Sequence, residues 1–455
     1  MGYLCKYQKN DPNEPVSIEI PGSKSQSNRM LMLAHQKRAN LNLIQNLSDS
    51  RDTQLLLKAL QKLDLLKNEI EKNVDYFQWS HYQLQEDEVS DLSNHVSNQL
   101  QNEKFDMFDA GTPARMLLAY FSALGIQTQL TGNKSLQNRS MQPLIDVLES
   151  GGAKFEFHKE PGYFPLSITR GLAKFPSKKI DRSISSQYVS SMMLIAPIFS
   201  TENKIEFEGH EHSQSYIEMT KKCMEDCGIQ ITIVNNSISI LSHQFKFPNH
   251  FIIEADWSSA SYFYSVCALR PNSNLLIPYL KENSCQGDSA CAEFFIDLGV
   301  TTVFNQSGCT IAQNISHKSS IDWDLSDVPD LAPTLIATAC ALDITGKIKG
   351  IQNLIYKESN RIESINQIIT QLGYIICESS EKFDEYFLQK TEQVSVTKIL
   401  NVKTHSDHRI AMAFATLSTK IPVLIDDVKC VEKSFPNFWN ELKKCNFEIN
   451  PYESE

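Results

Sequence analysis

A short polar stretch near the N-terminus carries the side chains best suited to binding an anion. Residues 21–29 read Pro-Gly-Ser-Lys-Ser-Gln-Ser-Asn-Arg, which places one lysine, one arginine and three hydroxyls after a Pro-Gly turn. The alternating residues 16–20 predict a strand before the turn, and the apolar spacing after it predicts a helix from Ser27 onward. A helix start favours anions. An ordinary solvated helix cap explains this stretch equally well if it stands alone.

Further charged and hydroxyl residues recur at other predicted helix starts. They are Arg139, Ser213, Asp288, Arg361 and Lys433-Ser434. A positive charge at a helix start opposes the helix dipole and needs a compensating anion. If these helix starts converge, they form a local anion site even in a chain of net charge -11.

The composition excludes several classes of protein. A net charge of -11 argues against nonspecific binding of nucleic acid or of an anionic membrane. No apolar run approaches ~20 residues, and the N-terminal residues lack a signal-peptide core. The 11 cysteines lack the paired spacing of a metal site. We therefore expect a cytoplasmic protein with no structural metal and no membrane or nucleic-acid partner.

One pattern repeats along the chain, namely an amphipathic helix, a left-handed stop residue and an alternating strand. The predicted stops are Gly152, Gly228, Gly299, Gly373 and Asn446. They are spaced by about 73 residues, and Asp64, after a helix over 52–63, adds a sixth stop if residues 67–104 are an insertion. The spacing predicts six α/β units.

Six motifs occur in an order that resembles the 5-enolpyruvylshikimate-3-phosphate (EPSP) synthase family. They are residues 21–29, Asp109-Ala110-Gly111-Thr112, Ser185-Ser186-Gln187, Lys357-Glu358-Ser359-Asn360-Arg361, Asp407-His408-Arg409 and Lys433-Ser434-Phe435-Pro436. The resemblance implies two similar domains, each of three βαβαββ-type units in an inside-out α/β barrel, with the active site in the interdomain cleft. It implies a first domain of residues 1–20 and 254–455, and a second of 21–253 that carries the insertion.

The resemblance also implies a reaction. The enolpyruvyl group of phosphoenolpyruvate is transferred to the 5-hydroxyl of shikimate 3-phosphate, and phosphate is released. Protonation at C3 makes C2 electrophilic, the hydroxyl adds, and the tetrahedral intermediate eliminates phosphate. The family implies no cofactor, a monomer, and inhibition by glyphosate at the phosphoenolpyruvate subsite.

Site residues follow motif by motif. The residues that match shikimate 3-phosphate contacts are Lys24, Ser25, Arg29, Ser185, Ser186, Gln187, Ser213, Asp330, Asn353 and Lys357. Those that match phosphoenolpyruvate contacts are Lys24, Asp109, Gly111, Arg139, Gln187, Arg361, Arg409 and Lys433. We expect Asp330 to remove the hydroxyl proton, and Glu358 and Lys24 to serve carbon protonation and phosphate departure. His408 is a weaker catalytic candidate, because a lone histidine is more often structural.

Four departures from the family pattern stand out. Asp109 replaces the usual asparagine, so it is either protonated, paired with a cation such as Arg115, or harmful to phosphoenolpyruvate affinity. Asn360 replaces the usual aspartate and is expected to loosen the orientation of Arg361. Met116 stands where many members have proline. The fourth departure is the insertion at 67–104.

Two rival functions remain open. A UDP-N-acetylglucosamine enolpyruvyl transferase shares the expected fold, but that family has Lys-Asn in its first motif and a loop cysteine. Here Ser25 follows Lys24, and no cysteine lies between Cys5 and Cys223. A noncatalytic anion-binding protein explains the cations, but not the carboxylates Asp330 and Glu358 among them.

Overall fold

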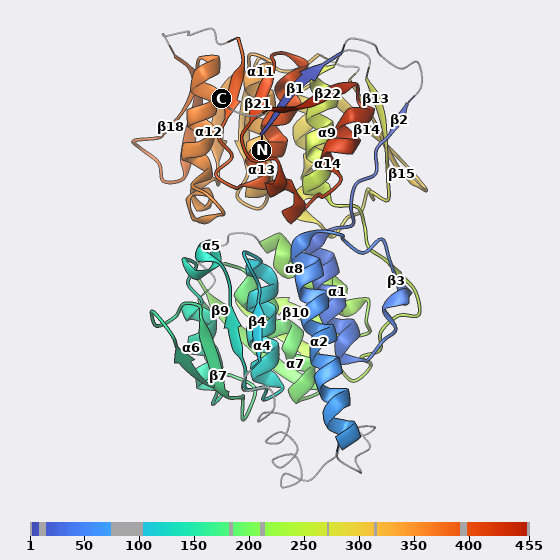
Figure 1. The fold of residues 1–455 in the computed structure, drawn as a ribbon, viewed down its shortest axis with the longest axis vertical. Coiled ribbons are helices and arrows are strands. Elements are labelled where there is room, and N and C mark those ends of the chain that lie inside the picture. Colours follow the sequence, from blue (N-terminus) through green and yellow to red (C-terminus); the bar gives the residue numbers. More distant parts are fainter. Residues whose placement is uncertain are drawn as a thin grey trace. The chain divides into compact units, whose positions relative to one another are not determined.

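The computed structural model divides into two compact units. It describes residues 2–8, 15–73, 103–181, 185–209, 214–270, 273–313, 316–391 and 398–452, without the side chains of 67–73. Unit 1 comprises residues 1–24, 46–50 and 252–455, and unit 2 comprises residues 25–45 and 51–251 (Figure 1). The predicted domain boundaries at 20/21 and 253/254 stay a prediction.

Unit 1 contains three four-stranded sheets. Their orders are β16-β17-β19-β18, β14-β15-β13-β2 and β20-β21-β1-β22. The strands are β1 (Gly2–Tyr7), β2 (Val16–Ser17), β13 (Asn274–Pro278), β14 (Val300–Asn305), β15 (Gly308–Gln313), β16 (Ser320–Asp324), β17 (Thr345–Lys349), β18 (Tyr374–Glu378), β19 (Glu385–Lys390), β20 (Leu400–Val402), β21 (Val423–Ile425) and β22 (Phe447–Tyr452). In each sheet one pair of neighbouring strands is parallel and the other two pairs are antiparallel. The N-terminal segment therefore completes two sheets whose other strands lie far along the chain.

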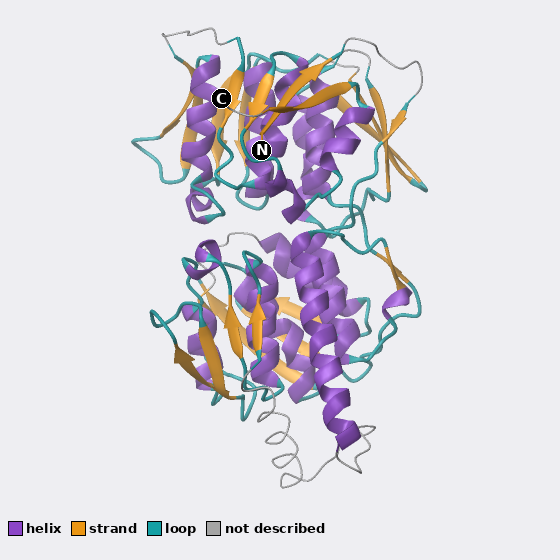
Figure 2. Ribbon diagram, viewed as in Figure 1, coloured by secondary structure: helices purple, strands orange, loops and turns teal. Residues whose placement is uncertain are grey.

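Three helices of unit 1 are buried on nearly all sides and pack against one another. They are α9 (Trp257–Leu269), α11 (Ala332–Ala341) and α13 (His408–Ala415). A helix that is apolar all round belongs in a core. The helices α10 (Cys291–Asp297), α12 (Arg361–Ile369) and α14 (Phe438–Lys444) bury only part of their residues. Helices and short sheets alternate in this unit in the manner expected of βαβαββ repeats (Figure 2).

Unit 2 contains two four-stranded sheets, each with one parallel and two antiparallel strand pairs. Its four-stranded sheets have the orders β4-β5-β7-β6 and β10-β11-β9-β8. Their strands are β4 (Lys104–Asp106), β5 (Gln129–Thr131), β6 (Lys154–Phe157), β7 (Leu166–Arg170), β8 (Ile180–Asp181), β9 (Glu202–Glu208), β10 (Gln230–Val234) and β11 (Ser237–Leu241). The helices are α1 (Lys24–Gln36), α2 (Arg51–Asn73), α4 (Gly111–Ala123), α5 (Lys134–Gln137), α6 (Gln142–Ser150), α7 (Gln187–Phe199) and α8 (Gln214–Glu225). The short strands β3 (Ile44–Gln45) and β12 (Phe251–Ile252) pair where the chain passes between the units.

The backbone confirms five of the predicted left-handed stops. Gly152, Gly228, Gly299, Gly373 and Asn446 all have φ between 64° and 101°. The strands β6, β10, β14, β18 and β22 begin within two residues of them. The α/β repeat was therefore readable from its stop residues, because only glycine and asparagine adopt this conformation at low cost.

Three local predictions were wrong. Helix α2 runs from Arg51 to Asn73, so Asp64 is a helical residue rather than a stop. Helix α1 begins at Lys24, three residues before the predicted start at Ser27. Strand β2 covers only Val16–Ser17 of the predicted strand over 16–20. The predicted insertion over 67–104 begins inside α2 and ends in β4, and its residues 74–102 lie outside the described residues.

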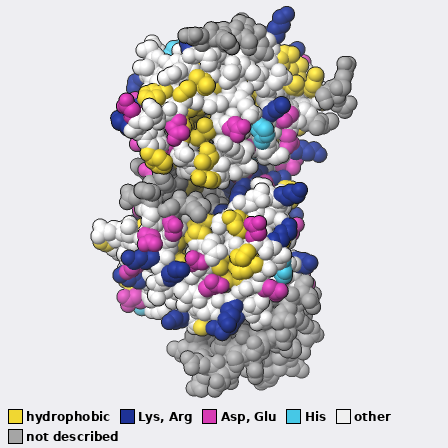
Figure 3. Space-filling model, turned by 90° about the vertical axis from the view of Figure 1, so that its left-hand side faces the viewer, with side chains coloured by type: hydrophobic (Ala, Val, Ile, Leu, Met, Phe, Trp, Pro, Cys, Tyr) yellow, Lys and Arg dark blue, Asp and Glu magenta, His cyan; other side chains and the backbone are white. Residues whose placement is uncertain are grey.

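The surface carries charges of both signs. Lysine, arginine, aspartate and glutamate side chains are interspersed on the face of each unit that Figure 3 presents. Among the described residues, no helix combines the length and the apolar character that crossing a membrane requires.

Candidate active site

The buried helices of unit 1 all begin next to an aspartate. Asp256 caps α9 by accepting from Ser259 N at 2.8 Å, and Asp407 caps α13 by accepting from Arg409 N at 2.9 Å. Asp330 lies in the 3₁₀ turn Pro329–Leu331, directly before α11. Carboxylates stabilise the positive end of a helix dipole. The fold thereby brings together three carboxylates from distant parts of the sequence.

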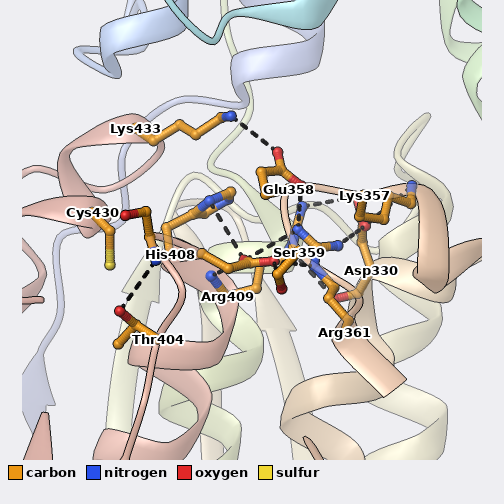
Figure 4. A network of polar contacts seen from close by, with 12 residues as sticks. Asp330, Lys357, Glu358, Ser359, Arg361, Thr404, His408, Arg409, Cys430 and Lys433 are labelled. Carbon is orange, nitrogen blue, oxygen red and sulfur yellow. Dashed lines mark hydrogen bonds and ion pairs between the residues drawn. The ribbon is translucent and has the colours of Figure 1, made fainter. Parts of the chain in front are cut away.

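Asp330 is surrounded by cations (Figure 4). Arg361 Nη1 donates to its Oδ1 at 2.9 Å, Arg409 Nη2 donates to its Oδ2 at 2.9 Å, and Lys357 Nζ lies 3.5 Å from Oδ1. Burial alone raises the pKa of this carboxyl, but Arg409, Lys357 and Arg361 outweigh burial and hold the pKa well below its usual value. Asp330 is therefore a carboxylate at neutral pH.

Arg361 is the centre of this network. As the first residue of α12 it is only 1% exposed. Its Nε donates to Asp407 at 2.7 Å, and its Nη2 donates to Glu358 at 2.7 Å, in addition to the bond with Asp330. These carboxylates outweigh the effect of burial and raise the pKa of the guanidinium. The predicted compensating anion at this helix start is thus supplied by the protein itself.

Glu358 bridges two cations. Its Oε1 lies 3.1 Å from Lys433 Nζ, and its Oε2 accepts from Arg361. Lys433 is buried at the end of the 3₁₀ helix Lys429–Lys433, and not at the start of the following α14. Both carboxylate oxygens of Glu358 are therefore engaged by buried cations.

His408 is buried without a hydrogen-bond partner among the described residues. It is 1% exposed, and its nearest carboxylate oxygen, Asp407 Oδ1, lies 3.9 Å from Nδ1. Burial depresses the pKa of the imidazole well below 6.5; Glu358 opposes this, while Lys24, Arg409 and Lys433 add to it. The ring is therefore neutral at pH 7, which makes it a poor acid and leaves it available to accept or donate a hydrogen bond.

Asp288 belongs to the same cluster, although we named it only as a helix-start residue. It lies in the 3₁₀ turn Gly287–Ala290. Burial and the nearby Asp330 raise its pKa to about 7, against the effect of Arg409. No motif marks this role, because the carboxylates that perturb Asp288 are distant in the sequence.

Two arginines of unit 2, Arg115 and Arg139, lie beside Gly111, the first residue of α4. Arg115 Nη1 donates to Gln187 Oε1 at 2.9 Å, and its guanidinium lies 5.4 Å from the Tyr188 ring centroid. Arg139 Nη2 donates to Ser135 Oγ at 3.4 Å. A Cβ on Gly111 would lie 2.7 Å from Arg115 Nη1 and 2.9 Å from Arg139 Nη1. Only glycine leaves both guanidinium groups undisturbed at this helix start.

Arg29 makes its contacts inside unit 2. It is 1% exposed and donates to Ser25 O, Thr220 Oγ1, Ser190 Oγ and Tyr216 O at 2.7–3.3 Å. These four acceptors are neutral hydroxyl and carbonyl oxygens, which fix the orientation of the guanidinium. Its predicted contact with shikimate 3-phosphate remains a prediction.

The other predicted residues lie at or near the starts of further helices. Ser185 and Ser186 precede α7, and Ser185 Oγ accepts from Gln187 N at 3.2 Å. Lys24 begins α1, where its N–H donates to Asp256 Oδ2 at 3.4 Å. Asn353 lies in the 3₁₀ helix Gln352–Tyr356, with a buried Oδ1 that has no partner among the described atoms. Ser213 lies outside the described residues.

Asp109 pairs with a cation that we did not anticipate. Arg51 Nη2 lies 3.2 Å from both carboxylate oxygens, whereas Arg115, the cation we suggested, donates to Gln187. The substitution of asparagine by aspartate was itself the signal that a cation must lie nearby. Sequence could not identify it, because Arg51 is 58 positions away.

Two other departures are accommodated locally. Asn360 caps α12 by accepting from Glu363 N at 3.2 Å. Arg361 is held by three carboxylates, so the expected loosening of Arg361 is not found. Met116 is 2% exposed within α4 and forms part of the core.

Comparisons with known proteins agree with one another. A family model described as EPSP synthase (3-phosphoshikimate 1-carboxyvinyltransferase) matches residues 14–442. A 3-phosphoshikimate 1-carboxyvinyltransferase of Bacteroides fragilis is 32% identical over 95% of this chain and 96% of its own. The protein of that name from Haemophilus influenzae is 30% identical over 94% of this chain and 96% of its own.

Solved structures share the fold. An EPSP synthase of Acinetobacter baumannii superposes with a TM-score of 0.70 at 18% identity, and the match covers 99% of this chain and 100% of that one. At this identity the similarity concerns the fold alone.

Proposed function

Because the chain belongs to the EPSP synthase family, we propose that it transfers the enolpyruvyl group of phosphoenolpyruvate to the 5-hydroxyl of shikimate 3-phosphate. One bond forms between the hydroxyl oxygen and C2, and the bond from C2 to the phosphate oxygen later breaks. The hydroxyl loses a proton and C3 gains and then loses one. The reaction therefore needs cations for phosphates and carboxylates, a base, and an acid.

The observation that carries the proposal is the network around Arg361. It combines Asp330 and Glu358 with Lys357, Arg409 and Lys433 within hydrogen-bond or ion-pair distance. Carboxylates weaken anion binding, so a protein that only bound anions would gain nothing from them. Their presence among the cations supports proton transfer next to an anionic ligand.

The electrostatics of Asp330 support its role as the base on the hydroxyl. Arg409, Lys357 and Arg361 depress its pKa in the structure described here. When phosphate or carboxylate oxygens of the substrates take over those cations, the burial of Asp330 is less fully opposed and its pKa rises. Substrate binding thereby converts a weak base into a stronger one.

Glu358 and Lys433 are suited to the second proton transfer. Their contact of 3.1 Å lets a proton and its counter-charge move together. Lys24 lies close enough to His408 to lower the pKa of that ring. We assign carbon protonation and phosphate departure to Glu358 and Lys24, because the charges of both act on the buried ring of His408 and so belong to one cluster.

The experiment is an assay of phosphate release with each substrate alone and with both. We expect release only with both substrates, and no inhibition by a chelator. Release with phosphoenolpyruvate alone contradicts the proposal. Release with UDP-N-acetylglucosamine as the acceptor instead indicates the related transferase, and binding without release indicates an anion-binding protein.

A further inference from the structure

We propose that Arg51 and Asp109 form a charge-compensated pair that sets the anion affinity of the site at the start of α4, with Arg51 as a positioning residue. The inference rests on the proposed function, because it takes phosphoenolpyruvate as the anion. The resemblance leads us to expect a neutral asparagine at position 109, whereas this chain has an aspartate two residues before Gly111.

The carboxylate of Asp109 cannot easily move away from this position. It lies on the loop before α4, and its side chain is 11% exposed. The preceding Phe108 has a φ of 49°, donates its N–H to Asp106 Oδ1 at 2.8 Å, and accepts from Asn133 N at 2.8 Å. A buried carboxylate on a fixed loop needs a partner that comes to it.

Arg51 provides that partner from the start of α2. Its Nη2 bridges both oxygens of Asp109 at 3.2 Å, and its guanidinium lies over the Phe108 ring at 4.8 Å from the centroid. An arginine at a helix start opposes the dipole and is itself stabilised by a carboxylate. Each residue thus removes the electrostatic penalty of the other, and the pair contributes no net charge to the anion site.

The chain contains a matched pair for comparison. Lys62, also on α2, lies 2.5 Å from Glu103 and 4.8 Å from the Phe105 ring centroid. This pair has the same chemistry, a cation between a carboxylate and a phenylalanine. It flanks β4 rather than the start of α4, and therefore serves as the control.

The experiment measures KM for phosphoenolpyruvate at saturating shikimate 3-phosphate in four proteins. Arg51→Gln leaves a net charge of -1 in the pair, Asp109→Asn leaves +1, and the parent and the double variant are neutral. We expect Arg51→Gln to raise KM about tenfold, because like charges in an interface oppose binding strongly. Asp109→Asn should lower KM or leave it unchanged, and the double variant should return it to near the parent value, with kcat altered less than KM throughout.

Three further measurements distinguish compensation from a merely structural role. Arg51→Lys keeps the charge and should retain a KM near that of the parent. The defect of Arg51→Gln should shrink only slightly as salt is raised, since salt screens a largely buried carboxylate such as Asp109 weakly. Lys62→Gln should leave KM unchanged, and thermal unfolding reports whether each variant is folded.

The outcomes separate this inference from the proposed function. A parent that releases no phosphate with both substrates contradicts the function. An active parent whose KM is the same in Arg51→Gln, or is raised equally in Lys62→Gln, overturns the inference. If Arg51→Gln does not fold, Asp109→Asn alone tests the inference. A KM for phosphoenolpyruvate that is higher in Asp109→Asn than in the parent then overturns the inference. Titration calorimetry measures the dissociation constant of phosphoenolpyruvate without turnover, and the four proteins should rank in the same order by this constant as by KM.

Discussion

The two units both place arginines near helix starts, but give them different hydrogen-bond acceptors. In unit 1, Arg361 and Arg409 donate to carboxylates of Asp330, Glu358 and Asp407. In unit 2, Arg29 and Arg115 donate to hydroxyl, carbonyl and amide oxygens. Carboxylates cancel positive charge, whereas neutral acceptors orient a guanidinium without cancelling it.

This difference means that the arginines of the two units exchange different partners when an anionic ligand binds. In unit 2, the hydrogen bonds of Arg29 and Arg115 to neutral oxygens orient the two guanidinium groups. The cations of unit 1 must exchange their carboxylates for ligand oxygens, and this exchange changes the pKa values of the groups proposed to move protons. Arg51 differs from Arg29 and Arg115 in that a carboxylate, that of Asp109, accepts from it.

The largest effect should follow from removing the central cation of unit 1. Arg361→Met leaves three carboxylates facing a buried apolar side chain, and breaking a buried ion pair in this way costs about 3–5 kcal/mol. Arg115→Met, the matched change in unit 2, removes the hydrogen bond to the neutral amide of Gln187, a loss that costs about 1–3 kcal/mol. Chemical denaturation measures both, and equal losses would show that the two clusters do not differ in the way described.

Removing the proposed base should reduce turnover more than stability. Asp330→Asn keeps the shape of the side chain, so we expect kcat to fall by about 10²–10⁴ while KM changes less. Asp322→Asn is the control, since Asp322 also pairs with a lysine in unit 1 but is 66% exposed. A kcat within threefold of the parent would exclude Asp330 as the base.

In unit 2, Gly111→Ala should act through the arginines. The added methyl group overlaps the ends of Arg115 and Arg139, which can move aside at moderate cost because both side chains are flexible. We expect the inhibition constant of glyphosate to rise more than KM for phosphoenolpyruvate, because glyphosate is the longer ligand. Steady-state inhibition kinetics measure both constants, and equal increases would mean that Gly111 does not distinguish the two.

The smallest effect concerns the pH dependence of stability in unit 1. Because the pKa of Asp288 is raised from 3.8 to about 7, the folded protein binds more protons than the unfolded chain between these values. The contribution of Asp288 to stability therefore falls as pH rises from about 4 to 7. Asp288→Asn should remove this loss, as measured by denaturant unfolding at several pH values, whereas Ser289→Ala should retain it. An unchanged pH slope in Asp288→Asn contradicts the assignment.

Local sequence predicted the elements whose signals are local. The stops at Gly373 and Asn446 were readable because the left-handed backbone is costly for most other residues. Asp64 misled us because an aspartate can also lie within a helix, and α2 continues for nine residues beyond it. Sequence spacing gave the repeat, while the exact helix ends depended on packing.

In the candidate active site, too, the sequence determined some features and the tertiary structure decided others. The motifs by themselves determined which residue types were present, namely the cations of Arg361, Arg409 and Lys433 and the carboxylates of Asp330 and Glu358, together with the family to which they belong. Only the tertiary structure decided the pairing. It joined Arg51 to Asp109 rather than Arg115, and it brought Asp288 close enough to Asp330 for their charges to interact. Electrostatic energy depends on distance and burial, and neither is contained in the separation of two residues along a chain.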